Sequence, residues 1–317
     1  MFTFYPNYYQ KFKCKADKCI HSCCRDWEID IDCETLEKYN AVQGQMGDEL
    51  RSNIASTPEP HFVLTKEGAC PFLNENGLCR IILNLGEDHL CDICRLHPRF
   101  VLEYLNCREI GVGMCCEAAT ELILDEPEAL YCVIDHGDQD TVATPKLTKW
   151  EKSVLKKRQE CFDIIFNYRS SISKVRSELL KLIDLDGLSI PFKSLVKILL
   201  KAEILDKGWE DTLRYALNAR AKKQSVINEQ QIRNLIAYFI FRHLSCSEDE
   251  FALEENLVFS VVSTDIIVGL CSFYNNDKGV YDICRMYSSE IEYSTTNKDY
   301  IMSQIEEFDI KDLKDAF

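Results

Sequence analysis

The chain has 317 residues, of which 46 % are hydrophobic and 28 % are charged, so it is long enough and apolar enough to fold around a proper core. Its formal net charge of −15 argues against a broad nucleic-acid-binding surface. Only 12 glycines and 8 prolines are present, which disfavours loop-rich sandwiches and propellers and favours helices.

The acidic excess is concentrated in the first part of the chain. Residues 1–135 hold 12 Lys and Arg against 23 Asp and Glu, whereas residues 136–317 hold 25 against 29. An acidic surface suits a cationic partner such as a lysine-bearing protein segment, and it also serves solubility. No nucleic-acid partner is expected.

The chain begins with MFTFYPNYYQKFK, which lacks the basic head and apolar run of a signal peptide. We therefore expect a cytoplasmic protein whose thiols stay reduced. There are 17 cysteines, and 13 of them lie within residues 1–132. The other four are widely spaced, and we interpret them as small buried hydrophobic side chains.

We predict a mainly α fold with two domains. Residues 1–135 form an irregular, cysteine-rich, metal-binding domain, and residues 145–317 form an all-helical bundle that could recognise a substrate. In the first domain, residues 34–54 show the pattern of one or two helices, residues 100–113 alternate like a short β-hairpin, and CCEAATELIL begins another helix. The polar segment DHGDQDTVATP links the domains and ends in Thr144-Pro145, a suitable helix start.

The second domain shows helical periodicity throughout. Apolar residues recur at steps of three, four and seven from Trp150 to Leu182, and residues 146–181 carry ten Lys and Arg, which indicates a solvated or docking face. The run IRNLIAYFIFRHL is apolar on most sides and is expected in the core. Further helices are predicted at about 190–204, 207–222, 228–245, 252–275, 278–291 and 297–316.

The apolar run at residues 256–274 is the best membrane-span candidate. It carries Asp265 near its middle, and a bare aspartate at the centre of a bilayer costs roughly 3 kcal/mol. We therefore expect a buried helix there, and no membrane partner.

The cysteines of the first domain fall into four groups. They are Cys14, Cys19, Cys23 and Cys24; Cys70 and Cys79; Cys91 and Cys94; and Cys115 and Cys116. Thiolates borne on several loops can converge on one soft or borderline metal. Eight or more candidates exceed the four ligands of a structural zinc, but both zinc and an iron–sulfur cluster remain compatible with the pattern. Cys19 and Cys23 have the first spacing of the C-x3-C-x2-C signature of radical enzymes. The third position is Asp26 rather than a cysteine, so the signature is absent.

Three stretches carry a resemblance to a known family: FKCKADKCIHSCCRDW, CPFLNENGLCRIILNLGEDHLCDICRLHPRF and EIGVGMCCEAATELIL. They resemble the zinc- or iron-chelating C-x-x-C-x-x-C-C domain and, more specifically, the bacterial flagellin lysine-N-methylases. The resemblance spans about residues 1–125, and the helical remainder offers no motif to match.

The resemblance implies a cytoplasmic enzyme that transfers methyl groups from S-adenosylmethionine to lysine side chains of flagellin. It also implies a 4Fe-4S cluster held by the cysteine-rich part. Two cysteines, Cys91 and Cys116, depart from the expected pattern. The cysteines on motif positions, and thus the implied metal ligands, are Cys14, Cys19, Cys23, Cys24, Cys70, Cys79, Cys94 and Cys115.

The sequence gives little indication of where S-adenosylmethionine binds. The only glycine-rich signal is GVG at 111–113, which a hairpin end also explains, and no Rossmann-like alternation surrounds it. Arg95 and Arg99 could bind the carboxylate of the cofactor or offset the charge of a cluster. No catalytic residue can be assigned. Two further hypotheses stay open: a non-catalytic metal-binding interaction module, and a redox or metal sensor with a labile cluster.

Overall fold

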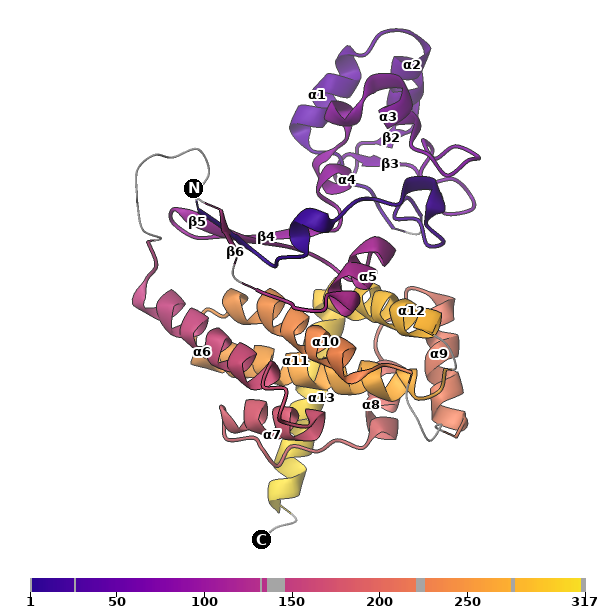
Figure 1. Cartoon of the computed structure of the whole chain (residues 1–317). Helices are drawn as coiled ribbons and strands as arrows, with labels where there is room; N and C mark the ends of the chain where they lie inside the picture. The colour runs from indigo at the N-terminus through magenta and orange to yellow at the C-terminus, as the bar shows by residue number, and fades with distance from the viewer. Residues whose placement is uncertain are drawn as a thin grey trace. The chain divides into compact units, whose positions relative to one another are not determined.

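The computed structural model describes residues 2–25, 27–131, 133–135, 146–220, 226–274 and 277–314 (Figure 1). The chain forms two compact units. The inserted unit is Lys13–Phe100, and the main unit combines Met1–Phe12 with Val101–Phe317. The chain thus divides at different positions from the predicted 1–135 and 145–317, and most of the predicted linker, with Thr144-Pro145, lies outside the described residues.

The inserted unit is built from short elements. Asp32 caps the first helix by accepting the Thr35 N–H, and two helices are present in the stretch 34–54, where one or two were predicted. An apolar core gathers Ile29, Ile31, Tyr39, Leu50, Phe62, Phe72 and Ile81. The elements are η2 (Ala16–Lys18), α1 (Cys33–Ala41), α2 (Gly44–Ser52), β2 (Ile54–Ala55), β3 (His61–Phe62), α3 (Arg80–Leu85), η3 (Glu87–His89) and α4 (Asp92–Leu96).

The main unit contains a four-stranded sheet in the order β4-β5-β1-β6. Consecutive strands β4 and β5 are neighbours joined by a tight turn, in which the Tyr104 N–H donates to the Cys107 carbonyl, so the predicted hairpin is confirmed. The strand β1 pairs parallel to β5 and antiparallel to β6. The strands are β1 (Phe2–Tyr5), β4 (Arg99–Glu103), β5 (Cys107–Val112) and β6 (Val133–Asp135).

Helices make up the rest of the regular secondary structure in the described main unit, which confirms the mainly α fold. Their bounds are α5 (Glu117–Asp125), α6 (Lys149–Ile165), α7 (Ile172–Lys181), α8 (Phe192–Leu199), α9 (Lys207–Asn218), α10 (Glu229–His243), α11 (Glu250–Cys271), α12 (Asp277–Tyr287), the π-helix η5 (Ser288–Glu292) and α13 (Thr295–Lys314), with short 3-10 turns η1 (Tyr9–Lys11) and η4 (Leu244–Cys246).

The long helical pattern from Trp150 to Leu182 is interrupted. The helix α6 ends at Ile165, and Ser171 caps the start of α7 by accepting the Lys174 N–H. The buried guanidinium of Arg233 donates to the carbonyls of Ile165 and Ser170. These carbonyls therefore find a partner on another helix, which allows the chain to turn where the periodicity continues.

Two buried helices form the centre of the main unit. As predicted, α10 is buried on nearly all sides, and it packs against α11, α5 and α6 (Figure 1). The apolar run at 256–274 falls mostly within α11, where Asp265 pairs with Arg176 of α7 at 2.7 Å. Among the described residues, every helix falls short of the length and apolarity that crossing a bilayer requires.

Candidate functional site

Five cysteines of the inserted unit gather in or against its core. We call them the thiol cluster, and they are Cys24, Cys70, Cys79, Cys91 and Cys94. The sulfur atoms are close enough to shift one another's pKa values. All described cysteines are free thiols, and the described residues contain no disulfide.

Backbone pairing brings these thiols together from segments far apart in the chain. The Cys70 N–H donates to the Cys24 carbonyl at 2.8 Å, which joins two loops. Cys79 occupies the residue before α3, and Cys91 occupies the residue before α4, so both sit at helix starts where backbone N–H groups are exposed. Cys94 lies in α4 itself.

The electrostatics of the cluster favour a mixture of thiols and thiolates. A hydrogen bond from Cys94 lowers the pKa of Cys91, and the same bond raises the pKa of Cys94. A hydrogen bond from Cys23 lowers the pKa of Cys24 to about 7, against the effect of burial. Burial instead raises the pKa of Cys70 to about 12.

Backbone N–H groups already point at several of these sulfur atoms. Hydrogen bonding from the backbone N–H of Phe72 acts to lower the pKa of Cys70, and that from Ile81 and Ile82 acts to lower the pKa of Cys79, in both cases against burial. The Cys94 N–H acts in the same direction on the pKa of Cys91. Hydrogen bonds to sulfur of this kind tune iron–sulfur clusters, so the donor chemistry fits a thiolate-bound iron–sulfur cluster or a zinc ion. As the side chains lie, however, no group of three or more His, Cys, Asp or Glu among the described residues is arranged to hold a metal ion.

A partly buried histidine, His97, adds a nitrogen donor to the inserted unit. Burial lowers the pKa of His97 to about 4, so its ring is neutral at pH 7, and Nε2 has no hydrogen-bond partner within the described part of the chain. A neutral imidazole nitrogen with no partner is a group that can bind a metal.

The eight predicted ligands lie in different surroundings in the structure. Cys24, Cys70, Cys79 and Cys94 lie in the thiol cluster, together with Cys91, which departs from the family pattern. Cys23 is the hydrogen-bond partner of Cys24. Cys14 is exposed and accepts the Ala16 N–H at 3.3 Å, and Cys19 lies next to η2. Cys115 belongs to the main unit.

Cys115 lies beside a buried polar network of the main unit. Burial raises its pKa to about 12, and it shares a hydrogen bond with Tyr293. The Gly113 backbone passes so close to this network that an added Cβ would lie 2.3 Å from Tyr293 Oη and 2.7 Å from Arg242 Nη1. Tight packing therefore explains a glycine at the end of the GVG signal.

Glu292 is the centre of this network. Its carboxylate is fully buried and accepts hydrogen bonds at 3.1 Å from Tyr238, Arg242 and His243. Burial raises the pKa of Glu292, but Arg242 and His243 outweigh that effect, so the pKa is below its ordinary value. The π-helix η5 places this carboxylate, and such irregular turns often occur at functional sites. Sequence periodicity gave no sign of this network.

The two arginines proposed as cofactor ligands lie in other surroundings. Arg95 is half exposed and pairs with Asp92 at 2.5 Å within α4. Arg99 begins β4, and its charge helps to lower the pKa of His97. Neither arginine lines the aromatic pocket of the main unit.

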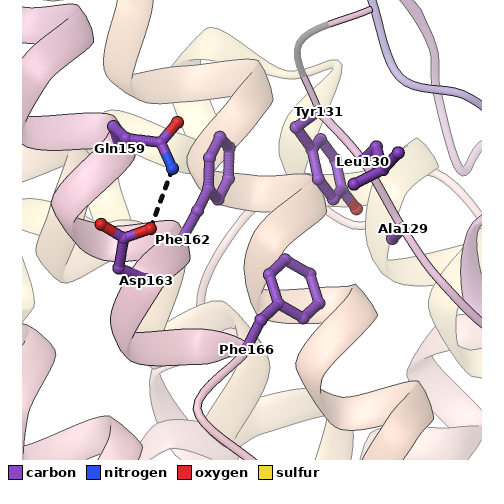
Figure 2. Close-up of a pocket in the computed structure, with 7 residues that line it drawn as sticks. All are labelled: Ala129, Leu130, Tyr131, Gln159, Phe162, Asp163 and Phe166. Carbon is purple, nitrogen blue, oxygen red and sulfur yellow. Dashed lines mark hydrogen bonds between the residues drawn. The ribbon is translucent and has the colours of Figure 1, made fainter.

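A pocket of about 440 Å³ opens in the main unit (Figure 2). One wall is aromatic, because the Tyr131 ring stacks on Phe162 with centroids 4.9 Å apart and lies 6.4 Å from Phe166. Gln159 and Asp163 of α6 form a polar edge, where Gln159 donates to Asp163 at 2.9 Å. The lining residues are Ala129, Leu130, Tyr131, Gln159, Phe162, Asp163 and Phe166.

Comparison with known proteins places this helix-dominated, thiol-rich chain in a family. A family model described as the FliB lysine N-methylase C-terminal domain matches residues 104–317. Because that match covers more than half of the chain, the protein belongs to the FliB lysine N-methylase family. The match coincides with the continuous part of the main unit, including the helices where no motif was apparent.

Individual relatives agree with this family. The chain is 26 % identical over 192 residues to a protein named "Lysine-N-methylase" from Salmonella typhimurium (strain LT2), covering 56 % of this chain and 46 % of that protein. The same values hold for the "Lysine-N-methylase" of Salmonella choleraesuis (strain SC-B67). It is also 27 % identical over 139 residues to "Flagellar biosynthetic protein FliU" of Salmonella muenchen, covering 39 % of this chain and 78 % of that protein.

The chain spans about half the length of the two lysine-N-methylases that it matches. No solved structure matches the chain.

Proposed function

We propose that this protein is a cytoplasmic methyltransferase that uses S-adenosylmethionine to methylate lysine side chains of flagellin. The observation that carries this proposal is the family match over residues 104–317, together with relatives named for lysine methylation and for flagellar biosynthesis. The names of those relatives support methylation of a flagellar protein, and the choice of flagellin and of the methyl donor rests on the family resemblance.

The proposed reaction is a direct displacement. A neutral lysine Nζ attacks the methyl carbon, the carbon–sulfur bond of the sulfonium breaks, and S-adenosylhomocysteine leaves while one proton passes from nitrogen to solvent or a base. Free lysine has a pKa of about 10.4, so the site must favour the neutral amine and hold the two reacting atoms in line. Desolvation beside aromatic rings lowers the pKa of an amine.

We further propose that the inserted unit holds a 4Fe-4S cluster, with zinc as the alternative. Cys24, Cys70, Cys79 and Cys94 would hold it, because they are predicted ligands that lie in the thiol cluster, and Cys91 is an additional candidate. When bound, such a group would supply a rigid anchor for the segments that carry these cysteines. The thiols of a cytoplasmic protein stay reduced and available for it.

The methylation experiment uses purified full chain, kept free of oxygen, with flagellin and S-adenosylmethionine labelled in the methyl group. We expect label on lysine side chains, located by mass spectrometry of peptides. Flagellin whose lysines have been acetylated is the matched control and should take up no label. Flagellin that stays unlabelled while the enzyme is folded and loaded would overturn the proposal and leave a non-catalytic metal protein or a redox sensor.

The cluster is tested by measuring iron, zinc and inorganic sulfide in protein prepared without oxygen. We expect iron and sulfide in the wild type and their loss in Cys70→Ser and Cys94→Ser, whereas Cys246→Ser of the main unit keeps them. Zinc without sulfide would support a zinc site in place of the cluster. Protein that contains no iron and no zinc would refute both the cluster and the zinc site.

A further inference from the structure

The pocket of the main unit has the composition of a site for an organic cation. Tyr131, Phe162 and Phe166 present an aromatic wall, and Asp163 is the only charged residue among the seven that line it. Aromatic faces attract cations, and a carboxylate at the edge adds a charge of the right sign. The volume of about 440 Å³ is in the range of small-ligand sites, so a side chain and some flanking backbone fit.

The aromatic wall is held in place from behind. Tyr131 is only 4 % exposed, and its hydroxyl donates to the Asn234 carbonyl at 3.2 Å. The rings of Tyr8 and Phe241 pack against the same tyrosine. A wall that is already ordered loses little conformational entropy when a ligand binds.

The polar edge of the pocket can accept further hydrogen bonds from a ligand. Asp163 and Gln159 are exposed residues one turn apart on α6, and the amide of Gln159 donates to one carboxylate oxygen of Asp163. An ionised carboxylate accepts about four hydrogen bonds, so this contact orients Asp163 without saturating it. An ammonium group entering over the rings would meet this carboxylate.

We propose that this pocket binds the side chain of the acceptor lysine, including its methylated forms, with the alkyl stem against the rings and the nitrogen near Asp163. The proposal rests on the proposed lysine methylation. A methyl donor fits the pocket less well, because S-adenosylmethionine carries a carboxylate and the lining includes no Lys or Arg to pair with it. The acidic character of the chain suits the same cationic partner.

The binding test needs no methyl transfer. The full chain is titrated, by ligand-observed NMR without S-adenosylmethionine, with a short peptide that carries one lysine. The same peptide is used with trimethyllysine and with the neutral tert-butyl isostere of trimethyllysine. We expect both cationic peptides to bind at least about threefold more tightly than the neutral isostere, because only they have a cation–π attraction. Equal binding of all three would reduce the pocket to an apolar hollow and overturn the proposal.

Two variants locate that binding. Asp163→Asn and Phe166→Leu should each weaken binding of the cationic peptides about threefold and leave the neutral isostere unchanged. Asp211→Asn and Phe251→Leu change exposed residues of the same types on α9 and α11 and should leave binding as in the wild type. Cationic peptides that bind equally to the pocket variants and the controls would place their site elsewhere.

Turnover separates this inference from the proposed function. In the methylation assay, the pocket variants should raise the KM for the protein substrate about threefold and retain most of kcat. Normal KM in both variants, with active wild type, would overturn the pocket and leave the methylation proposal standing. In a third outcome, the wild type binds cationic peptides selectively, the variants lose that binding, and no lysine is methylated. That result would support the proposed lysine pocket and overturn the proposed methylation.

Discussion

The inserted unit and the main unit bury their apolar surface in different ways. The inserted unit has helices of five to nine residues around a small core that includes thiols. The main unit has α10 and α11, with 15 and 22 residues, buried on most sides. A small core of short elements gains much from a bound metal, whereas long packed helices do not need one. The comparison predicts that the inserted unit depends on its proposed metal for stability, whereas the main unit depends on helix packing.

Removal of the proposed metal should give the largest effect, and it should affect one unit only. In apo protein, or in Cys70→Ser, we expect backbone amides of residues 13–100 to lose most of their protection from hydrogen exchange, because a bound structural metal contributes on the order of 10 kcal/mol to such domains. Amides of α10 and α11 should keep theirs. Equal protection of the inserted unit in apo and loaded protein would show that its core suffices alone.

The buried pair between Arg158 of α6 and Glu109 of β5 should be the most sensitive ionic contact of the main unit. The guanidinium donates to both carboxylate oxygens at 2.6 and 2.7 Å, and both side chains are nearly inaccessible to water. Arg158→Met leaves the buried Glu109 carboxylate without its ionic partner. It should lower the free energy of unfolding of the main unit by about 3–5 kcal/mol.

Urea titration followed by hydrogen exchange measures this loss. Arg214→Met is the matched control, since its partner Glu210 lies on the exposed face of α9, and it should cost less than about 1 kcal/mol. If both variants lose a similar free energy of unfolding, the buried pair contributes no more to stability than the exposed pair.

Acid should weaken the main unit through His243. Burial lowers the folded-state pKa of this histidine from 6.5 to about 4, against the attraction of Glu292. The unfolded chain therefore binds more protons between these values, and stability present above pH 6.5 falls by about 3 kcal/mol as the pH drops towards 4. Urea midpoints at several pH values test this, and His243→Gln should show a smaller slope. An unchanged slope would assign the acid sensitivity to other groups.

The close approach at Gly113 should give the smallest of these effects. Gly113→Ala introduces a methyl group against Tyr293 and Arg242, and we expect a loss of about 1–3 kcal/mol in the main unit as those side chains shift. Gly187→Ala is the control, because a Cβ there meets nothing within 4 Å. Thermal melting compares them, and an equally stable Gly113→Ala would remove the packing explanation for this glycine.

Local patterns predicted most of the fold. The helices of the main unit follow their periodicity, and the β4-β5 hairpin follows its alternation, because both depend on neighbouring residues. The break between α6 and α7 was missed because Arg233, more than sixty residues away, supplies the partner for the carbonyls there. The parallel pairing of β1 with β5 joins Phe2 to Cys107, a distance in sequence that no local pattern reports.

The sequence predicted the chemistry of the candidate site but only some of the residues that form it. Cysteine spacing indicated a metal, but loop conformation decides that Cys24 and Cys94 meet while Cys14 stays exposed. Cys91 departs from the family pattern, yet it lies in the thiol cluster, directly before α4. The aromatic pocket was not predicted, because Phe162 and Phe166 lie one helical turn apart but Tyr131 completes the pocket from another segment.

The insertion of residues 13–100 within the main unit orders events during synthesis. The strand β1 leaves the ribosome before the inserted unit, and its partner β5 follows roughly a hundred residues after β1, so β1 must wait unpaired. The inserted unit is contiguous and can gather its thiols during that interval, since domains fold as units while the chain grows. If the inserted unit binds the proposed metal, binding could thus precede closure of the sheet, and β1 would pair only when β5 has been made.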